Sequence, residues 1–295
     1  MSKVDLAGRT AIVTGAGGGL GRTYAIDLAK HGAKVIVNDL GSSREGDGKD
    51  TQPAQKVVEE IIALGGKAVA NFDSVVTGAD KIIKTALDNF GTVDILVNNA
   101  GFVRDMAFVK INDEAWDSVV DVHLKGAFAC IRAAWPVMRE KQYGRIVNIS
   151  SGSGLFGNFG QASYAAAKIA VVGLANVLKI EGAKNNIFIN VVAPVAGTRL
   201  NKEVIPPEIF QKSKPELVAA MVTYLCSEQC KENGSIFNAG VGYFSRSAIM
   251  TGSGWYGGSN ATAEDVMQNF DQIKSLEKLK YYNKIDEQLM ELFKG

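Results

Sequence analysis

The sequence is poor in cysteine, histidine and proline, and it carries almost no net charge. Its 295 residues include three cysteines, two histidines and six prolines, and the formal net charge is +1. Proteins that bind nucleic acid by neutralising phosphates carry a basic excess, so nucleic acid is not an expected partner. The small number of histidine and cysteine ligands also argues against a metal site.

The three cysteines are Cys130, Cys226 and Cys230, and we interpret all of them as reduced thiols in a reducing compartment. No apolar run approaches the ~18 residues that a membrane span needs. The first residues lead straight into an expected strand and leave no room for a signal peptide. The final Phe-Lys-Gly is not a peroxisomal address of the Ser-Lys-Leu type. We therefore expect a soluble, intracellular protein without a membrane span.

A glycine-rich turn near the N-terminus is the first positive signal. The apolar run 10–13 predicts a buried parallel strand, and TGAGGGLG follows it and opens a stretch with helical spacing. In this arrangement, backbone N–H groups and the positive end of the helix face a pyrophosphate. Gly15, Gly19, Leu20 and Gly21 are therefore predicted to bind a dinucleotide. A tight loop without a ligand is the alternative.

A carboxylate follows the second expected strand, 34–38. Asp39 lies about twenty residues past the glycine turn, where a carboxylate accepts hydrogen bonds from the adenine-ribose hydroxyls. Its charge would repel a 2′-phosphate, and Arg44 lies some way into the next loop, so NAD is favoured over NADP. Asp39 could instead be a simple turn residue. The polar, glycine-rich segment 41–53 is expected to be a surface insertion or flap.

The third and fourth expected strands also end in small or polar residues. Asp73 and Ser74 follow the third strand, where a short polar side chain can hydrogen-bond the adenine edge. Asn99, Ala100 and Gly101 follow the fourth strand, and their small size suits close approach of the backbone to the cofactor. The simpler interpretation of both segments is a turn.

The stretch NISSGSGLFGNFGQASYAAAK contains the candidate chemistry. Tyr164 and Lys168 are four residues apart, so they share one face of the expected helix. A neighbouring ammonium lowers the pKa of a phenol, which is ~10 when unperturbed. Ser151 returns beside the phenol if the intervening loop folds over. The three side chains predict a proton-transfer site for an alcohol or a ketone, although Tyr-x-x-x-Lys alone also occurs by chance on many helices.

In combination, these motifs resemble the short-chain dehydrogenase/reductase family: TGAGGGLG, NNAG, and Ser151 with Tyr164 and Lys168 stand in the family's order and at its separations. The resemblance covers roughly residues 5–241. It implies an α/β fold, namely a Rossmann-type doubly wound parallel seven-stranded sheet with helices on both faces. We expect residues 1–245 to form the NAD-binding domain with the catalytic site, and residues 246–295 to form a C-terminal extension packed on the same domain.

Longer segments, among them VIVNDLG, VHLKGAF and GNFGQASYAAAK, are similar to the dehydrogenase module of one branch, the peroxisomal multifunctional enzymes type 2. This resemblance implies NAD-dependent oxidation of (3R)-3-hydroxyacyl-CoA to 3-oxoacyl-CoA in fatty-acid β-oxidation, with Tyr164 as the general base. It also implies an acyl-CoA substrate and a homodimer or tetramer. The implied location is peroxisomal if the source is eukaryotic and cytoplasmic otherwise.

One position departs from the wider family, which usually has an asparagine in the helix before the catalytic strand. His123 stands there, and we expect it either to join a proton relay or to pack with a hydrogen bond to the backbone. Two other functions stay open. One is a dehydrogenase for a steroid or other secondary alcohol, and the other is a non-catalytic NAD-binding scaffold.

Overall fold

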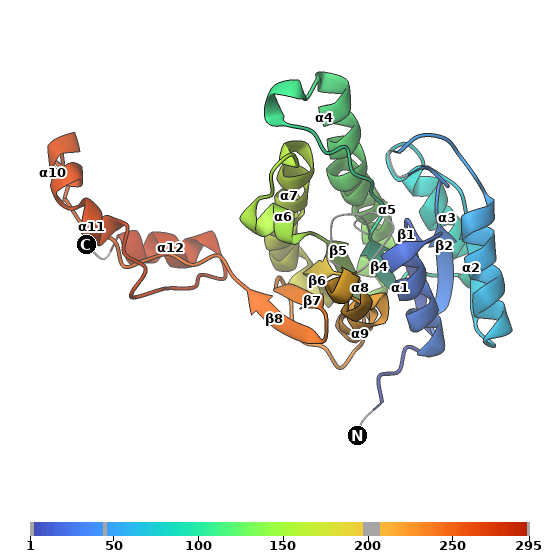
Figure 1. Cartoon of the computed structure of the whole chain (residues 1–295). Helices are drawn as coiled ribbons and strands as arrows, with labels where there is room; N and C mark the ends of the chain where they lie inside the picture. The colour runs from blue at the N-terminus through green and yellow to red at the C-terminus, as the bar shows by residue number, and fades with distance from the viewer. Residues whose placement is uncertain (1–2, 44–45, 197–206, 294–295) are drawn as a thin grey trace. The chain divides into compact units, whose positions relative to one another are not determined.

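The computed structural model describes residues 3–43, 46–196 and 207–293 (Figure 1). It divides the chain into two compact units, Met1–Arg246 and Ser247–Gly295. Arg44, which bears on the choice between NAD and NADP, lies outside the described residues.

The first unit is built on an eight-stranded sheet with the order β3-β2-β1-β4-β5-β6-β7-β8. All pairings among the first seven strands are parallel. The strand order reverses between β1 and β4, the switch point at which doubly wound sheets bind ligands. The strands are β1 (Thr10–Thr14), β2 (Lys34–Asn38), β3 (Lys67–Asn71), β4 (Ile95–Asn98), β5 (Gly144–Ile149), β6 (Ile187–Val195), β7 (Ile236–Gly240) and β8 (Tyr243–Ser247).

Helices cover both faces of this sheet (Figure 1). One face packs against α1 (Gly19–Lys30), α2 (Gln52–Ala63) and α9 (Pro215–Leu225). The other packs against α3 (Ala79–Phe90), α5 (Gly126–Lys141) and α7 (Ala162–Gly182). The shorter elements of the unit are η1 (Phe108–Lys110), α4 (Asp113–Val120), η2 (Asp121–Lys125), α6 (Gly152–Phe156), η3 (Ala183–Asn185) and α8 (Pro207–Lys212).

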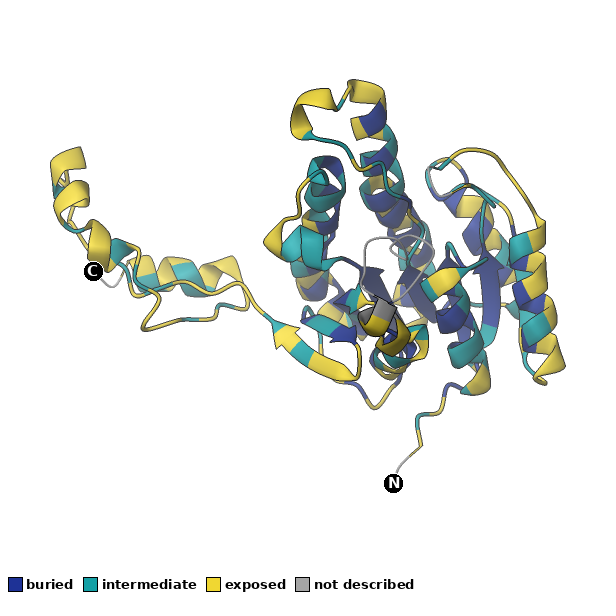
Figure 2. Cartoon of the chain, viewed as in Figure 1, coloured by how far each residue is buried: buried dark blue, intermediate teal, exposed yellow. Residues whose placement is uncertain are grey.

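The central strands are apolar because helices cover both of their sides. Every residue of β1, β4 and β5 is buried, and Figure 2 shows the buried residues concentrated in the sheet and in the helix faces that pack on it. Such continuous apolar runs are typical of parallel strands with two covered faces. The expected doubly wound α/β fold is confirmed.

The sheet has one strand more than the seven that we expected. The connection between β7 and β8 is only two residues long, and a parallel connection cannot be that short, so β8 returns antiparallel. Both turn residues have positive φ, 48° at Val241 and 82° at Gly242, as a type I′ hairpin turn requires. The half-exposed sequence YFSRS gives only a weak strand signal, which explains why it was missed.

Helix α7 corrects the expectation that no segment is long and apolar enough to span a membrane. Ala162–Asn185 meets that test by length and composition, with a mean hydropathy of 1.4. The core helix of a soluble protein passes the same test, and Val171, Val172 and Ala175 on α7 are buried in this unit. We therefore interpret α7 as a core helix of the doubly wound unit.

The second unit contains three short helices, α10 (Ala263–Gln268), α11 (Phe270–Ile273) and α12 (Ile285–Leu292). An isolated antiparallel bridge links Thr251 with Lys280. Among its described residues, none is buried. The packing of this extension on the first unit stays a prediction.

Candidate active site

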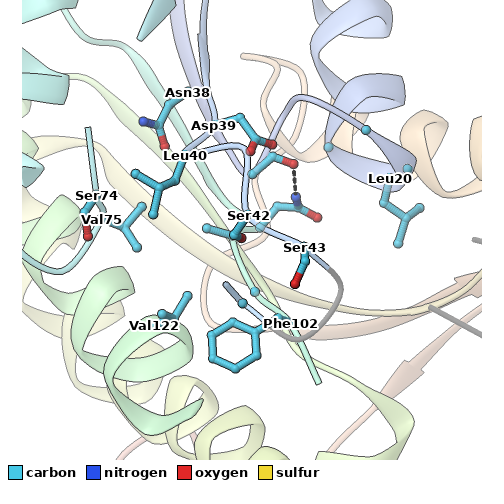
Figure 3. A pocket seen from close by; sticks show the side chains of 18 of the residues that line it. Leu20, Asn38, Asp39, Leu40, Ser42, Ser43, Ser74, Val75, Phe102 and Val122 are labelled. Carbon is cyan, nitrogen blue, oxygen red and sulfur yellow. Dashed lines mark hydrogen bonds between the residues drawn. The ribbon is translucent and has the colours of Figure 1, made fainter. Parts of the chain in front are cut away.

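A cleft opens at the carboxyl ends of the strands on both sides of the switch point (Figure 3). It has about 1040 Å³ of empty space, part of it open to solvent. All predicted cofactor-binding residues except Tyr164 and Lys168 line it, namely Gly15, Gly19, Leu20, Gly21, Asp39, Asp73, Ser74, Asn99, Ala100 and Gly101. The sequence motifs therefore converge on one site.

The glycine turn at this cleft has no room for a side chain at Gly15 or Gly21. Gly15 has a φ of 63°, and a Cβ there would lie 2.7 Å from the Ala100 Cα. A Cβ on Gly21 would lie 2.1 Å from the carbonyl oxygen of Gly15. Helix α1 begins after Gly18 with no side-chain cap and no acidic residue in its first turn. Its N–H groups are thus available to an anion, which fits the pyrophosphate of a dinucleotide.

Asp39 has a structural role as well as a place in the cleft. One carboxylate oxygen accepts a hydrogen bond from the Gly17 N–H at 2.6 Å, and the other accepts one from the Gly41 N–H at 2.7 Å. The carboxylate therefore links the glycine turn to the loop after β2. The two interpretations of Asp39, ribose ligand and turn residue, are compatible in this geometry.

Two pairs of asparagines hydrogen-bond neighbouring strands to each other at the carboxyl edge of the sheet, below the cleft. Asn38 on β2 donates to the Asn71 side chain opposite it on β3 at 2.8 Å. Asn98 on β4 donates to the Asn148 side chain opposite it on β5 at 2.9 Å. The Asn71 amide also donates to the Asp73 carboxylate at 2.9 Å, which orients Asp73. Sequence reasoning did not assign Asn38 to the site, although an asparagine ending a buried strand was the available signal.

The glycine turn and the NNAG segment are tied directly to each other. The Asn99 side chain donates to the carbonyl oxygens of Thr14 and Gly15, at 3.0 Å each. The Thr14 hydroxyl in turn accepts from the Asn99 and Ala100 N–H groups, both at 3.1 Å. Asn99 thus acts as a backbone clamp that holds the two cofactor loops together.

The apolar walls of the cleft were missed in the sequence. Leu40, Val75, Phe102 and Val122 line it together with residues of the motifs (Figure 3). Three of them directly follow predicted site residues along the chain. Val122 has no such signal, because its place at the cleft depends on how η2 packs.

Ser151, Tyr164 and Lys168 come from two neighbouring segments. Ser151 follows β5 and caps α6, and Tyr164 and Lys168 lie on α7. The Ser151 side chain lies close to the phenol of Tyr164 and acts to lower its pKa. The Lys168 Nζ lies 5.7 Å from the centre of the Tyr164 ring and donates to the Ile149 carbonyl at 2.6 Å. Lys168 lines a small second cavity whose walls share Val75, Ala100 and Val122 with the dinucleotide cleft. Lys168 therefore lies next to the cleft.

The electrostatics of the trio differ from our expectation. Burial raises the pKa of Tyr164, the Ser151 side chain opposes that rise, and the carboxylate of Asp105 adds to it. Burial also lowers the pKa of Lys168 to about 7. The expectation that the ammonium lowers the phenol pKa is therefore wrong for the protein alone. Desolvation is the largest cause of the raised Tyr164 pKa, and a buried lysine with a pKa of about 7 carries only part of its charge at neutral pH.

His123 lies on the π-helical turn η2 and packs against both halves of the site. Its Nε2 is 2.7 Å from the carbonyl oxygen of Phe102 and 3.2 Å from the N–H of the same residue. Its ring meets the Tyr164 ring edge-on at 5.1 Å. Burial, and next the charge of Lys168, lower the pKa of His123 to about 3, so the ring is neutral at physiological pH.

The second cavity gathers polar atoms that lack partners. It measures about 10 Å³, close to the smallest cavity that can hold one water molecule. Among the described residues, Asn98 Oδ1, His123 Nδ1 and Asn148 Nδ2 are buried without a hydrogen bond, and all three residues line this cavity with Lys168. Buried polar groups of this kind are usually satisfied by an ordered water.

No group of three or more histidine, cysteine, aspartate or glutamate side chains that could bind a metal occurs in the described part of the chain. The three cysteines are free and buried.

The family model of the short chain dehydrogenases matches residues 9–208. The chain belongs to this family. Peroxisomal multifunctional enzyme A of Dictyostelium discoideum is 50% identical over 273 residues, which are 92% of this chain and 62% of that protein. This short-chain dehydrogenase thus spans less than two thirds of that relative.

Two solved structures extend the comparison. Full-length peroxisomal multifunctional enzyme type 2 from Drosophila melanogaster matches with a TM-score of 0.84 and 40% identity, over 99% of this chain and 50% of that one. A 7α-hydroxysteroid dehydrogenase complexed with NADH and 7-oxo glycochenodeoxycholic acid matches with a TM-score of 0.73 and 30% identity, over 81% of this chain and 95% of that one. The resemblance to the multifunctional enzymes is confirmed, and a nicotinamide cofactor is implied.

Proposed function

We propose that the chain is an NAD-dependent dehydrogenase that oxidises (3R)-3-hydroxyacyl-CoA to 3-oxoacyl-CoA in fatty-acid β-oxidation. The observation that carries this proposal is the trio of Ser151, Tyr164 and Lys168 beside a cleft that fits a dinucleotide. Likeness to the multifunctional enzymes over 92% of the chain supports the acyl-CoA substrate.

NAD is the proposed cofactor because Asp39 places a negative charge at the ribose end of the cleft. The same carboxylate that fixes the glycine turn would accept hydrogen bonds from ribose hydroxyls and repel a 2′-phosphate. Asp73 and Ser74 would contact the adenine edge, and Lys168 with Tyr164 would hold the nicotinamide ribose.

The chain's own residues move the proton in this mechanism. NAD, when bound, accepts the hydride from C3 of the substrate. Tyr164 takes the proton of the C3 hydroxyl as general base, and Ser151 hydrogen-bonds that oxygen as it becomes a carbonyl. Because burial raises the pKa of Tyr164, the phenolate depends on positive charge from Lys168 and from the oxidised nicotinamide.

His123 is proposed to act in this site as a neutral hydrogen-bonding group. With a pKa of about 3 it does not take up a proton at neutral pH. Its Nδ1 has no hydrogen-bond partner in the described structure, and His123 and Lys168 line the same small cavity, so His123 would support a relay through water from the lysine. Its Nε2 fixes the backbone of Phe102 in the wall of the cleft.

Substitution of Tyr164 by Phe tests the mechanism. We expect Y164F to abolish NADH formation and to leave NAD binding close to wild type, because only the proton acceptor is removed. Y224F, which alters a tyrosine on the exposed side of α9, is the matched control and should keep full activity. Unchanged turnover of Y164F would remove Tyr164 from its role.

The second candidate function keeps the chemistry and changes the substrate to a steroid or another secondary alcohol. The structural likeness to a 7α-hydroxysteroid dehydrogenase favours it. Comparing kcat/KM for hydroxyacyl-CoA esters of several chain lengths with kcat/KM for steroid alcohols separates the two. If NAD binds and no alcohol is oxidised, the third candidate, a non-catalytic NAD-binding scaffold, gains support.

A homodimer or tetramer is also proposed. In Ser247–Gly295 no described residue is buried, yet large apolar side chains are exposed, among them Ile249, Phe270 and Leu292. Such surfaces are usually covered by assembly. Sedimentation equilibrium tests this proposal, and a monomer at micromolar concentration would contradict it. The proposed location is peroxisomal in a eukaryotic source and cytoplasmic otherwise.

A further inference from the structure

The side chain of Gln161 joins three separate segments around the candidate active site. Its amide oxygen accepts from the Ser153 hydroxyl at 2.7 Å and from the Asn158 side chain at 3.1 Å. Its amide nitrogen donates to both carboxylate oxygens of Asp105, at 3.1 Å each. Two donors on one end and a carboxylate on the other fix the orientation of the amide.

This amide lies where the catalytic segments meet. Gln161 immediately precedes α7 and is three residues before Tyr164. Ser153 donates its N–H to the Ser151 hydroxyl at 3.1 Å, so the same network reaches the serine of the candidate trio. A backbone hydrogen bond from Met106 to Gly160, at 2.8 Å, runs parallel to the contact between Asp105 and Gln161. The loop before α7 is thereby bound to the segment that follows NNAG.

Few charged groups face the phenol from the elements around it. Lys168 lies on its own helix, and the neutral His123 ring faces it from η2. The elements α6 and β6 contain no titratable side chain. Asp121 on η2 is paired with Lys125 at 3.3 Å. The acidic residues of α4, which packs on α7, have no described contact with the phenol: Asp113, Glu114 and Asp117.

Asp105 is the carboxylate whose charge acts on Tyr164 in the described structure, and it raises the pKa of that phenol. The same carboxylate is held in place by the Gln161 amide. Asp105 itself is exposed, so added salt screens its charge. The hydrogen bonds of Gln161 and the charge of Asp105 therefore both bear on the surroundings of Tyr164.

We propose that Asp105 and Gln161 form a positioning element for Tyr164, in which the Gln161 amide holds the surrounding segments and the Asp105 carboxylate sets the field in which the phenol loses its proton. The role deepens the proposed function and rests on it. Neither residue touches the reacting atoms. The charge of Asp105 makes the phenol a weaker acid in the resting protein, so that ionisation depends more strongly on the positive charge of bound oxidised cofactor.

The test compares the pH dependence of kcat/KM for four variants. D105N keeps the shape of the side chain, and its amide oxygen can still accept from Gln161. Because only the charge is lost, the acid limb of the pH profile of kcat/KM should move to lower pH. D105E keeps the charge and should keep the wild-type limb. Q161M removes the hydrogen bonds at similar volume and should lower kcat while NAD affinity is retained. D88N removes an exposed carboxylate paired with Lys84 on α3 and should leave the limb unchanged.

A second measurement does not depend on turnover. Titration of ¹³Cζ-labelled tyrosine by NMR, with the Tyr164 signal assigned by its absence in Y164F, reports the phenol directly. We expect D105N to ionise at lower pH than wild type, with a difference that shrinks as salt is added. An unchanged acid limb and titration in D105N, or an equal shift in D88N, would overturn the proposal. If hydroxyacyl-CoA esters are not oxidised at all, the proposed function fails, and the NMR titration still decides the role of the pair.

Discussion

Replacement of His123 by Gln is expected to change how the stability of the protein depends on pH. The His123 ring is buried, and its pKa falls from 6.5 to about 3 in the folded chain. Below pH 6.5 the unfolded chain therefore binds a proton at His123, whereas the folded chain does not bind it until the pH approaches 3. Stability is lost as the pH falls from 6.5 towards 3, and at pH 5 the loss from this one group is about 2 kcal/mol. Glutamine does not titrate, and its amide can still donate to the carbonyl of Phe102.

Urea unfolding at pH 7 and pH 5 measures this effect. The drop in unfolding free energy between the two pH values should be about 2 kcal/mol smaller in H123Q than in wild type, whatever packing energy the substitution costs at pH 7. H31Q replaces the other histidine, which is the C-cap of α1, and serves as the matched histidine-to-glutamine control. If H123Q loses as much stability as wild type between pH 7 and 5, the ring is not a buried neutral base and the reasoning is refuted.

Three further predictions concern the lysine, the glycine turn and the hairpin. K168M should remove the rise in stability between pH 7 and 9, about 2 kcal/mol in wild type, because the pKa of Lys168 is lowered from 10.5 to about 7; urea unfolding at both pH values checks this. G21A should abolish NAD binding in a fluorescence titration, since its Cβ would meet the Gly15 carbonyl, whereas G173A, in open space on α7, should bind normally. V241N should raise the melting temperature by relieving a positive φ of 48°, a gain of about 1 kcal/mol; an unchanged melting temperature would contradict the assigned turn.

The buried strands and the glycine turn were predictable because their signals are local. An apolar run such as that of β1 has few alternatives to a buried parallel strand, and a glycine with no room for a Cβ, such as Gly21, is visible as a motif. The same holds for Asp39, which directly follows β2 at a fixed distance from that turn. These residues converge on one cleft because the carboxyl ends of parallel strands share one edge.

What the sequence could not supply depends on tertiary packing. The pKa of Tyr164 is raised rather than lowered because burial removes the phenol from water, and burial of this kind has no local signal. Val122 reaches the cleft only through the packing of η2, and β8 is an edge strand with a weak apolar pattern. The contact between Gln161 and Asp105 joins residues 56 positions apart, and no sequence motif predicts it.

The decisive experiment is stereospecific turnover. NADH formation is followed at 340 nm with (3R)- and (3S)-3-hydroxyacyl-CoA as separate substrates, with Y164F as the blank. We predict oxidation of the R ester and none of the S ester. Activity confined to the S ester would contradict the assignment to the multifunctional-enzyme reaction.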